Sequence, residues 1–380
     1  MNIGIDGRVL EKKMTGIARY LINILNEIPN HDSLNRYYVF TNRPQNLIDN
    51  KYFNNVFTNY PLINSKLFTP FWLNYVIPKL IDQHKIDIFI GPNFFVPTVK
   101  VKNVKYISII HDIIPLTHPQ YFPLSYRVFI RTFLPKSIKN SDFIITNSQT
   151  SKTEIIKYFN IPEEKIEYVY NTFPNNFKPL NNIEKEKIKA ELILNLPEKY
   201  FLYVGMIEVR KNIDLLINIS DLIKLNKLNF KIILVGKPGF GFSRLIKEIN
   251  KRKDVIIYLN HVNDSELLYL YNFAYAFIFP SFVEGFGLPP LEAMSCGLPV
   301  LASDCNALRE ILGEDAILHS PYDANSFLNS IMKLINDNNF YNTMKIKSIR
   351  HTNKFTKENI TKKFISIIEK VYLSNINKHK

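Results

Sequence analysis

The stretch PSFVEGFGLPPLEAMSCGLPVLAS, residues 280–303, places two glutamates, Glu284 and Glu292, between two short hydrophobic runs. Glu284 stands in a glycine-containing loop, and Glu292 is expected in the first turn of a helix over residues 290–296. Glycines let backbone amides approach a ligand, and prolines at a helix start give up no needed N–H donor. Free N–H groups at a helix start bind anions. The stretch therefore predicts a strand, a ligand-binding loop and a helix.

The two carboxylates need a separate explanation, because an anion site repels them. An ionised carboxylate accepts several hydrogen bonds, so it can hold paired hydroxyl groups. A nucleotide sugar supplies both parts, a diphosphate for the amides and hydroxyl-rich rings for the carboxylates. The alternative for Glu292 is that it only complements the helix dipole. Glu284, in the loop, has no comparable alternative.

Short apolar runs alternate with amphipathic segments along the 380 residues, a length that suits two domains. We expect five strands in each half, in parallel sheets covered by helices. A segment rich in Asn, Pro and charge, near residues 172–190, predicts the boundary. The expected organisation is a first Rossmann-like domain over 1–175 and a second over 190–355. A final helix within 356–380 either closes the second domain or packs back on the first.

The chain is basic, with 48 Lys and Arg against 34 Asp and Glu, a net charge of +14. Residues 1–180 hold 21 basic and 13 acidic residues, so their surplus is +8 and no single tail carries the charge. Two explanations stay open, compositional drift and attraction to phosphate-bearing ligands or anionic lipid. The sequence has neither a basic helix dense enough for a DNA groove nor an aromatic-basic RNA motif. We therefore expect no nucleic acid partner.

The cysteines Cys296 and Cys305 form neither a CxxC pair nor a disulfide framework, which favours a reducing, cytoplasmic compartment. The opening MNIGIDGRVL is typical of a strand and not of a signal peptide. No run approaches the ~20 apolar residues that span a bilayer. Membrane contact, if made, is therefore expected at the inner face of the cytoplasmic membrane.

Two aromatic and basic stretches, 66–80 and 124–139, suit such contact with anionic lipid, and Arg127 and Arg131 lie one turn apart in the second. The alternative is that both are ordinary helices whose apolar faces belong to the core.

Polar residues also follow other predicted strands, where ligands bind in open α/β sheets. Arg210 and Lys211 come after one strand, at the start of the next helix, where two cations can neutralise a diphosphate without a metal. The alternative for them is a pair of solvated surface charges. His111 and Asp112 directly follow an apolar strand in YISIIHDIIPL, which favours a functional over a structural role. Gly16 precedes a helix that could face a phosphate or an acceptor.

With these motifs in order, the chain resembles the GT4 family of retaining glycosyltransferases over essentially its whole length. The resemblance is carried by EGFGLPPLE, whose two glutamates have seven residues between them, and is supported by GMIEVRKN and HDIIPLTHP. It implies the α/β GT-B fold, in which two Rossmann-like domains face each other across a cleft. It also implies a nucleotide-sugar donor, a glycan or lipid-linked acceptor, and neither a cofactor nor a metal ion.

The resemblance also implies roles for residues of the second half. Glu284 would lie beside the hydroxyls of the transferred sugar, and Glu292 would hold the ribose. Arg210 and Lys211 would bind the diphosphate. The backbone amides that would assist them belong to Gly285, Phe286, Gly287 and Leu288.

In the first half, His111 and Asp112 would lie at the sugar and the reaction centre, and Gly16 near the diphosphate and the acceptor. The chain departs from one common family pattern, because Met206 stands where an Arg often follows the glycine after the strand. Diphosphate binding is therefore expected to depend on Arg210 and Lys211.

The subset that shares the GRxL…TGIxRY and HDxxPLxxP patterns contains many mannosyltransferases and rhamnosyltransferases of bacterial polysaccharide and lipopolysaccharide assembly. This makes GDP-mannose the best candidate donor. A front-face route, in which the leaving phosphate helps to deprotonate the acceptor, is the mechanism usually favoured for this family. The rivals are a nucleotide-sugar epimerase or phosphorylase of the same fold and a basic nucleic-acid-binding protein. The glutamate spacing favours sugar transfer over the first, and the lack of a dense basic helix or an RNA motif argues against the second.

Overall fold

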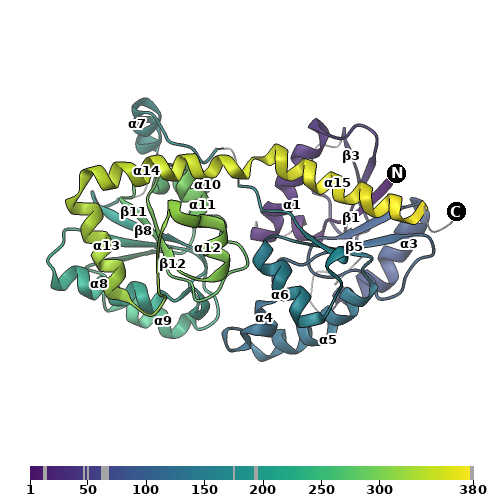
Figure 1. Ribbon diagram of the computed structural model, residues 1–380, viewed down its shortest axis with the longest axis horizontal. Helices are drawn as coiled ribbons and strands as arrows, with labels where there is room; N and C mark the ends of the chain where they lie inside the picture. The colour runs from purple at the N-terminus through teal and green to yellow at the C-terminus, as the bar shows by residue number, and fades with distance from the viewer. Residues whose placement is uncertain are drawn as a thin grey trace. The chain divides into compact units, whose positions relative to one another are not determined.

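The structure is a computed structural model that describes residues 1–11, 15–45, 48, 51–60, 68–173, 176–191 and 196–376. The chain divides into two compact units. Unit 1 comprises Met1–Pro119, Leu124–Phe173 and Phe355–Lys380, and unit 2 comprises Gln120–Pro123 and Pro174–Lys354. Each unit is built on one parallel sheet (Figure 1).

The described residues of unit 1 form a seven-stranded parallel sheet in the order β3-β2-β1-β4-β5-β6-β7. In β4 and β6 every residue is buried, as expected for strands covered on both faces. The strand order reverses between β1 and β4, where Ile3 pairs with Ile88. The strands are β1 (Asn2–Asp6), β2 (Arg36–Thr41), β3 (Phe53–Phe57), β4 (Ile88–Gly91), β5 (Lys105–Ile109), β6 (Phe143–Thr146) and β7 (Ile166–Tyr168).

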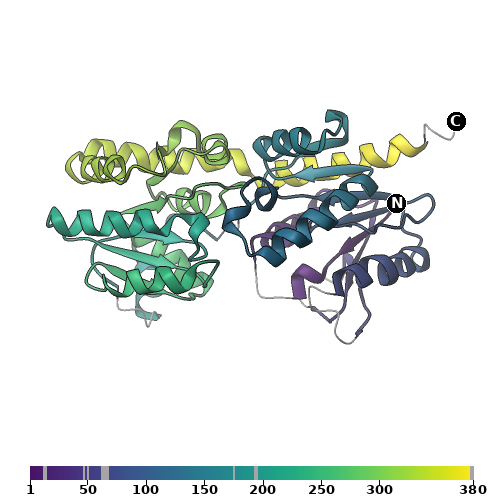
Figure 2. The same ribbon diagram turned by 90° about the horizontal axis from the view of Figure 1, so that it is seen from below.

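Helices flank this sheet on both sides (Figure 2). A continuous helical stretch from Thr69 to Gln83 contains a π-helical middle, η4. The long last helix, α15, packs against α1 within unit 1. The helices are η1 (Arg8–Glu11), α1 (Gly16–Glu27), η2 (Ile28–Asn30), α2 (Thr69–Phe71), η4 (Trp72–Val76), α3 (Ile77–Gln83), α4 (Ile114–Thr117), α5 (Leu124–Asn140), α6 (Gln149–Phe159), η6 (Glu163–Lys165) and α15 (Lys357–Ile376). The short helices η5 (Pro119–Tyr121) and η9 (Asn353–Phe355) each include residues of both units.

The described residues of unit 2 form a six-stranded parallel sheet in the order β10-β9-β8-β11-β12-β13. The order reverses between β8 and β11, and in open α/β sheets ligands bind at the carboxyl ends of the strands beside such a reversal. The strands are β8 (Tyr200–Val204), β9 (Lys231–Val235), β10 (Ile256–Leu259), β11 (Ala276–Phe279), β12 (Val300–Ser303) and β13 (Ile317–His319).

Helices also lie on both sides of the second sheet (Figure 2). Of these, α13 packs against α8, and α14 packs against α11. The helices are α7 (Asn182–Glu191), η7 (Val209–Lys211), α8 (Ile213–Leu225), α9 (Phe242–Asn250), α10 (Asp264–Phe273), α11 (Leu288–Ser295), α12 (Asn306–Leu312), η8 (Gly313–Asp315), α13 (Ala324–Asn336) and α14 (Asn338–Thr352).

The sequence-based element assignment was incomplete in both units. Strands β3, β7 and β13 were not expected, because they are short and, in β3, interrupted by two asparagines. Helix α7 forms inside the segment that was interpreted as a linker. Its start is stabilised by a reciprocal cap, in which Asn181 and Glu184 each accept a hydrogen bond from the other's backbone N–H at 2.9 Å.

Helix α11 begins at Leu288, two residues earlier than expected, so Glu292 lies in its second turn and the expectation of a first-turn position was wrong. The early start depends on Gly287, whose φ of 108° is a conformation that side-chain-bearing residues rarely adopt. A Cβ on Gly287 would also lie 2.6 Å from Cδ2 of Leu308. Gly287 therefore fixes where the loop ends and the helix starts.

We predict that Gly287→Ala lowers the free energy of unfolding by about 2 kcal/mol or more, through backbone strain and the clash with Leu308. Gly16→Ala is the matched control. A Cβ on Gly16 meets no described atom within 4 Å, so its effect should stay within about 0.5 kcal/mol. Urea unfolding of both variants checks this, and equal stability of the two would contradict the role given to Gly287.

Candidate functional site

A buried cluster of four charged side chains joins the loops that follow β8 and β11. Lys211 Nζ lies 2.5 Å from Oε1 of Glu284, and Arg210 Nη1 donates to Oε2 of the same carboxylate at 3.2 Å. Arg210 also donates to Glu208 Oε1 at 2.8 Å and to the backbone oxygen of Val283 at 3.0 Å. Two cations and two carboxylates thus lie together in the loops that leave β8 and β11, where the order of the strands reverses.

The neighbouring charges and burial shift the pKa values of Glu284 and Lys211. Burial acts to raise the pKa of Glu284, but the charges of Lys211 and Arg210 outweigh it and bring that pKa to about 2. Burial lowers the pKa of Lys211, and the neighbouring Glu284 charge opposes that effect. Lys211 Nζ also lies 4.8 Å from the centroid of the Phe279 ring, a cation–π contact. At neutral pH Glu284 is therefore a carboxylate, and its charge favours the protonated form of Lys211 beside it.

The turn that carries the two cations is a separate 3-10 turn, η7, and not the start of α8 as expected. Asn212 follows it with a φ of 54° and is buried. Its Nδ2 donates to the backbone oxygens of Pro280 at 3.1 Å and Pro321 at 2.7 Å. The Phe282 N–H donates to the oxygen of Arg210 at 3.0 Å. These bonds hold the loops after β8, β11 and β13 together.

Sequence reasoning quoted Glu208 and Asn212 within GMIEVRKN but assigned neither of them a role. An Asn that stands between two cations and a helical pattern indicates a turn before the helix, since Asn tolerates the left-handed conformation better than most residues. No comparable signal identifies Glu208, because an acidic residue after a strand is usually a surface charge.

Glu292 is buried on α11, and its Oε2 accepts a hydrogen bond from the Tyr271 hydroxyl of α10 at 2.9 Å. Because helix-dipole effects fade beyond the first turn, the alternative that Glu292 only complements the dipole is weakened. A carboxylate accepts several hydrogen bonds, a property that suits ligand hydroxyls. Tyr271 is a further residue that sequence reasoning missed.

The loop between the two glutamates consists of Gly285, Phe286, Gly287 and Leu288. The side chain of Phe286 is buried, and Gly287 is the cap residue directly before Leu288, the first residue of α11. The next two residues are prolines without an N–H, so the donors at this helix start come from the loop itself.

In unit 1, His111 follows β5 and is buried. Its Nε2 lies 3.0 Å from the backbone oxygen of Pro92, which places the proton on Nε2. The ring makes edge-on contacts with Tyr20, at 5.2 Å between centroids, and with Phe94, at 5.8 Å. Burial lowers the pKa of His111 to about 4, against a smaller opposing effect of the Pro92 bond. The imidazole is therefore neutral at physiological pH.

Asp112 stabilises the start of α4, because its Oδ1 accepts a hydrogen bond from the Ile114 N–H at 3.0 Å. Gly16 is the first residue of α1, whose cap is Thr15, and Thr15 Oγ1 accepts from the Ala18 N–H at 3.2 Å. Residues 12–14, in the motif that precedes Gly16, lie outside the described residues.

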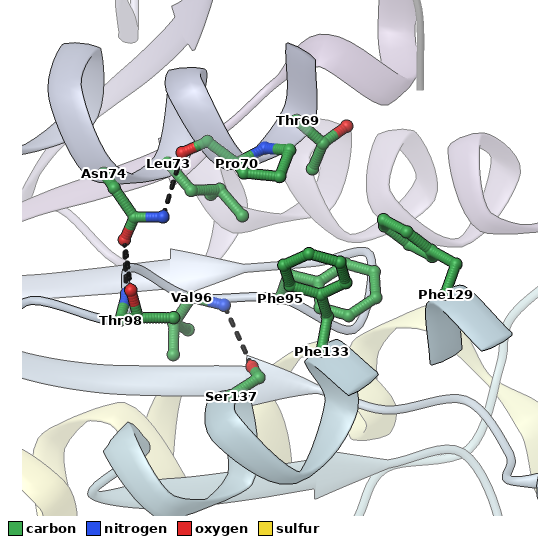
Figure 3. A pocket seen from close by; sticks show the side chains of 10 residues that line it. All are labelled: Thr69, Pro70, Leu73, Asn74, Phe95, Val96, Thr98, Phe129, Phe133 and Ser137. Carbon is green, nitrogen blue, oxygen red and sulfur yellow. Dashed lines mark hydrogen bonds between the residues drawn. The ribbon is translucent and has the colours of Figure 1, made fainter. Parts of the chain in front are cut away.

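The two aromatic and basic stretches of unit 1 contribute to its core. Trp72 and Val76 of η4 and Ile130 and Leu134 of α5 are buried. Between the two helical stretches lies a small apolar pocket of about 20 Å³, where Phe95, Phe129 and Phe133 gather (Figure 3). Residues 66–67 lie outside the described residues.

Both stretches also expose apolar side chains. Phe71, Tyr75, Leu124 and Val128 are 41–66% exposed. None of the described helices has the length and hydropathy needed to cross a membrane. Within the described parts of the chain, no group of three His, Cys, Asp or Glu side chains is arranged to hold a metal ion.

Comparisons with known proteins agree on one family. Residues 184–351 match the family model "Glycosyl transferases group 1", and residues 14–174 match "Glycosyltransferase Family 4". The chain is 32% identical to O-antigen chain mannosyltransferase B of Escherichia coli over 287 residues, 75% of this chain and 74% of that protein. It is also 28% identical to the serotype-specific mannosyltransferase WbdA of Escherichia coli. That match covers 66% of this chain and 32% of WbdA, which is the longer protein.

The fold has close relatives among solved structures. HepE of Anabaena, solved in complex with UDP-glucose, superposes with a TM-score of 0.73 at 19% identity, over 97% of this chain and 100% of HepE. The likeness confirms the expected fold class, the two Rossmann-like α/β units of the GT-B architecture.

We predict that Glu284→Gln destabilises the protein at pH 7 by an amount that shrinks on acidification. The pKa of Glu284 lies below its ordinary value of 4.5, so its contribution is complete above about pH 5 and is lost as pH falls toward 2. The difference from wild type should be on the order of 3 kcal/mol at pH 7. Urea unfolding at pH 7 and pH 3 measures it, with the exposed Glu198→Gln as control. A difference that does not change with pH would contradict the ion pair.

Proposed function

Because this chain belongs to the group 1 glycosyl transferases, glycosyltransferase family 4, we propose that it retains anomeric configuration and works without a metal. The donor in this proposal is a nucleoside diphosphate sugar, with GDP-mannose as the best candidate. The acceptor is a glycan or a lipid-linked sugar of a bacterial cell-surface polysaccharide. The observation that carries the proposal is the buried cluster of Arg210, Lys211 and Glu284 at the carboxyl ends of β8 and β11.

Donor binding requires an exchange of partners within this cluster. Its four charges cancel, so an incoming diphosphate competes with Glu208 and Glu284 for the two cations. The planar guanidinium of Arg210 and the point charge of Lys211 suit phosphate oxygens. Glu284, released from the cations, then accepts hydrogen bonds from the sugar hydroxyls. Glu292 and Tyr271 hold the ribose through hydrogen bonds to its hydroxyl groups.

In the chemical step, negative charge builds on the leaving diphosphate while the sugar becomes oxocarbenium-like. Arg210 and Lys211, once they have exchanged their carboxylate partners for phosphate oxygens, stabilise that charge together with the backbone amides of residues 285–288. His111 is neutral, so it orients a sugar hydroxyl and does not serve as a proton-donating acid. The leaving phosphate accepts the acceptor's proton.

The relatives support the substrate class more than the exact donor. The Escherichia coli relative is named as an O-antigen chain mannosyltransferase, which favours mannose. HepE was solved with UDP-glucose, which shows that this fold also accommodates a uridine nucleotide. An epimerase is not supported by any of these relatives.

Peripheral contact with an anionic membrane is part of the proposal. Helix α5 exposes the apolar side chains of Leu124 and Val128 and also the cations Arg131 and Lys136. Such a combination binds the interface of an anionic bilayer without spanning it. It would bring unit 1 to a lipid-linked acceptor.

The proposed activity is tested with GDP-, UDP- and dTDP-sugars and extracted lipid-linked acceptors, in the presence and absence of EDTA. We predict transfer that resists EDTA, with the anomeric configuration retained in the product. Glu284→Gln should lower kcat by about 100-fold or more with donor affinity kept within a few-fold, whereas Glu292→Gln should weaken donor binding as well. Full activity of Glu284→Gln, or dependence on a metal, would contradict the mechanism.

We predict that Glu208→Gln binds a nucleoside diphosphate more tightly than the wild type, by about fivefold or roughly 1 kcal/mol. The substitution leaves the cluster with one uncompensated positive charge. Asp214→Asn, which removes an exposed carboxylate paired with Arg244, is the control and should not change the affinity. Calorimetry measures both. Weaker binding to Glu208→Gln would mean that Glu208 itself positions the ligand.

For the membrane, we predict that Arg131→Glu with Lys136→Glu abolishes flotation with anionic liposomes in low salt. Each basic residue near such a surface contributes about 1 kcal/mol. Lys199→Glu with Lys253→Glu, an equal charge change on exposed residues of unit 2, is the control and should still float. Equal flotation of the two variants, or no flotation of the wild type, would refute membrane contact through α5.

A further inference from the structure

A second hollow in unit 1 lies along β3, the last strand of its sheet. It has a volume of about 620 Å³, and all five residues of β3, Phe53–Phe57, line it. Successive side chains of a strand point to opposite faces, so a hollow lined by five consecutive residues follows the edge of the strand. We call it the β3 groove. Its size is that of a ligand site.

The lining of the β3 groove is polar but uncharged. None of the described residues that line it is Lys, Arg, Asp or Glu, although 22% of the chain is charged. Three amides, Gln45, Asn54 and Asn55, provide both donors and acceptors. The Gln45 side-chain amide donates to Asn55 Oδ1 at 2.7 Å, which orients this pair. Such a surface suits a neutral, hydroxyl-rich ligand better than a nucleotide or an anionic lipid.

Aromatic rings supply the apolar part of the groove. Phe57, at the carboxyl end of β3, is 57% exposed. Tyr38 of β2 lies opposite Asn54, and its ring centroid is 5.1 Å from that of His84. The flat aromatic faces can pack against the C–H faces of a sugar ring, and the amides beside them can hydrogen-bond to its hydroxyl groups.

His84 leaves one polar atom unmatched in this lining. Its Nε2 is buried and has no hydrogen-bond partner among the described residues. A buried polar atom without a partner is costly, so it is expected to be matched by a water or a ligand hydroxyl. His84 is also one of the residues that line the groove.

The groove reaches the carboxyl ends of β2 and β3, which lie at the same edge of the sheet as His111 after β5. Four strand spacings separate β3 from β5 in the sheet order, or roughly 19 Å. A single sugar cannot span that distance, but an oligosaccharide can. A ligand that filled the groove and also reached His111 would therefore have to be an oligosaccharide.

We propose that the β3 groove is a second carbohydrate site, which holds a neutral stretch of the growing polysaccharide while its end is extended. The proposal rests on the proposed function for the identity of the chain. A different occupant of an exposed strand edge would be a strand from a second copy of the protein. The uncharged amides, the aromatic rings and the volume favour the glycan.

The test is native affinity electrophoresis of the full chain through gels that contain α-mannan, dextran or galactan. The test variant is Asn54→Ala with Phe57→Ala, both exposed positions. Asn93→Ala with Val99→Ala, also exposed and in unit 1, is the matched control. We expect at least one neutral polysaccharide to retard the wild type and the control, and its affinity to fall about tenfold or more in the test variant. Nucleotide affinity, measured by calorimetry, should be equal in all three.

Retardation by none of the polymers, or equal retardation of the test variant, would overturn the proposal. Sedimentation that shows a wild-type dimer, lost in the test variant and accompanied by no retardation, would assign the groove to a second copy. Retardation lost in the test variant, with no sugar transfer by the wild type from any donor, would instead refute the proposed function and leave the carbohydrate site standing.

Discussion

The buried ion pair between Glu284 and Lys211 is the interaction on which the candidate site depends. It joins residues 73 positions apart and is continued by Arg210 and Glu208. Burying such charges costs several kcal/mol per ion, so a cluster of this kind is a poor way to stabilise a fold. Its value lies in holding two cations dehydrated and oriented, ready for a ligand that brings its own negative charge.

The winding of the sheet explains why these residues meet. In unit 2 the order reverses between β8 and β11, so the loops that leave these neighbouring strands emerge at one edge. Asn212 then ties the cation turn to Pro280 and Pro321, and Gly287 ends the loop where α11 begins. The cluster is thus fixed by backbone geometry on both sides and is not a chance contact of long side chains.

Much of this could be predicted from residues that follow strands. Arg210, Lys211 and Glu284 could be assigned to one edge because parallel strands present their carboxyl ends together. Their mutual pairing could not, since it depends on which two strands are neighbours. The start of α11 was misplaced because the left-handed conformation of Gly287 has no signature in hydrophobic periodicity.

Other parts of the site carried weaker signals. Glu208, Asn212 and Tyr271 are residue types common on surfaces and in helices, and only their hydrogen bonds reveal them. The strand β3 was missed because FNNVF carries two asparagines, which are depleted in strands. The same two asparagines line the β3 groove. They therefore both weaken the strand pattern in the sequence and provide polar groups to the candidate binding surface.

The most direct measurement is a crystal structure of the protein with a bound nucleotide sugar or an unreactive analogue of it. The account predicts that Arg210 and Lys211 lie within about 3 Å of diphosphate oxygens, and that Glu284 has left the cations and accepts hydrogen bonds from sugar hydroxyls. A bound donor whose diphosphate lies elsewhere, with the ion pairs of Glu284 still intact, would contradict it.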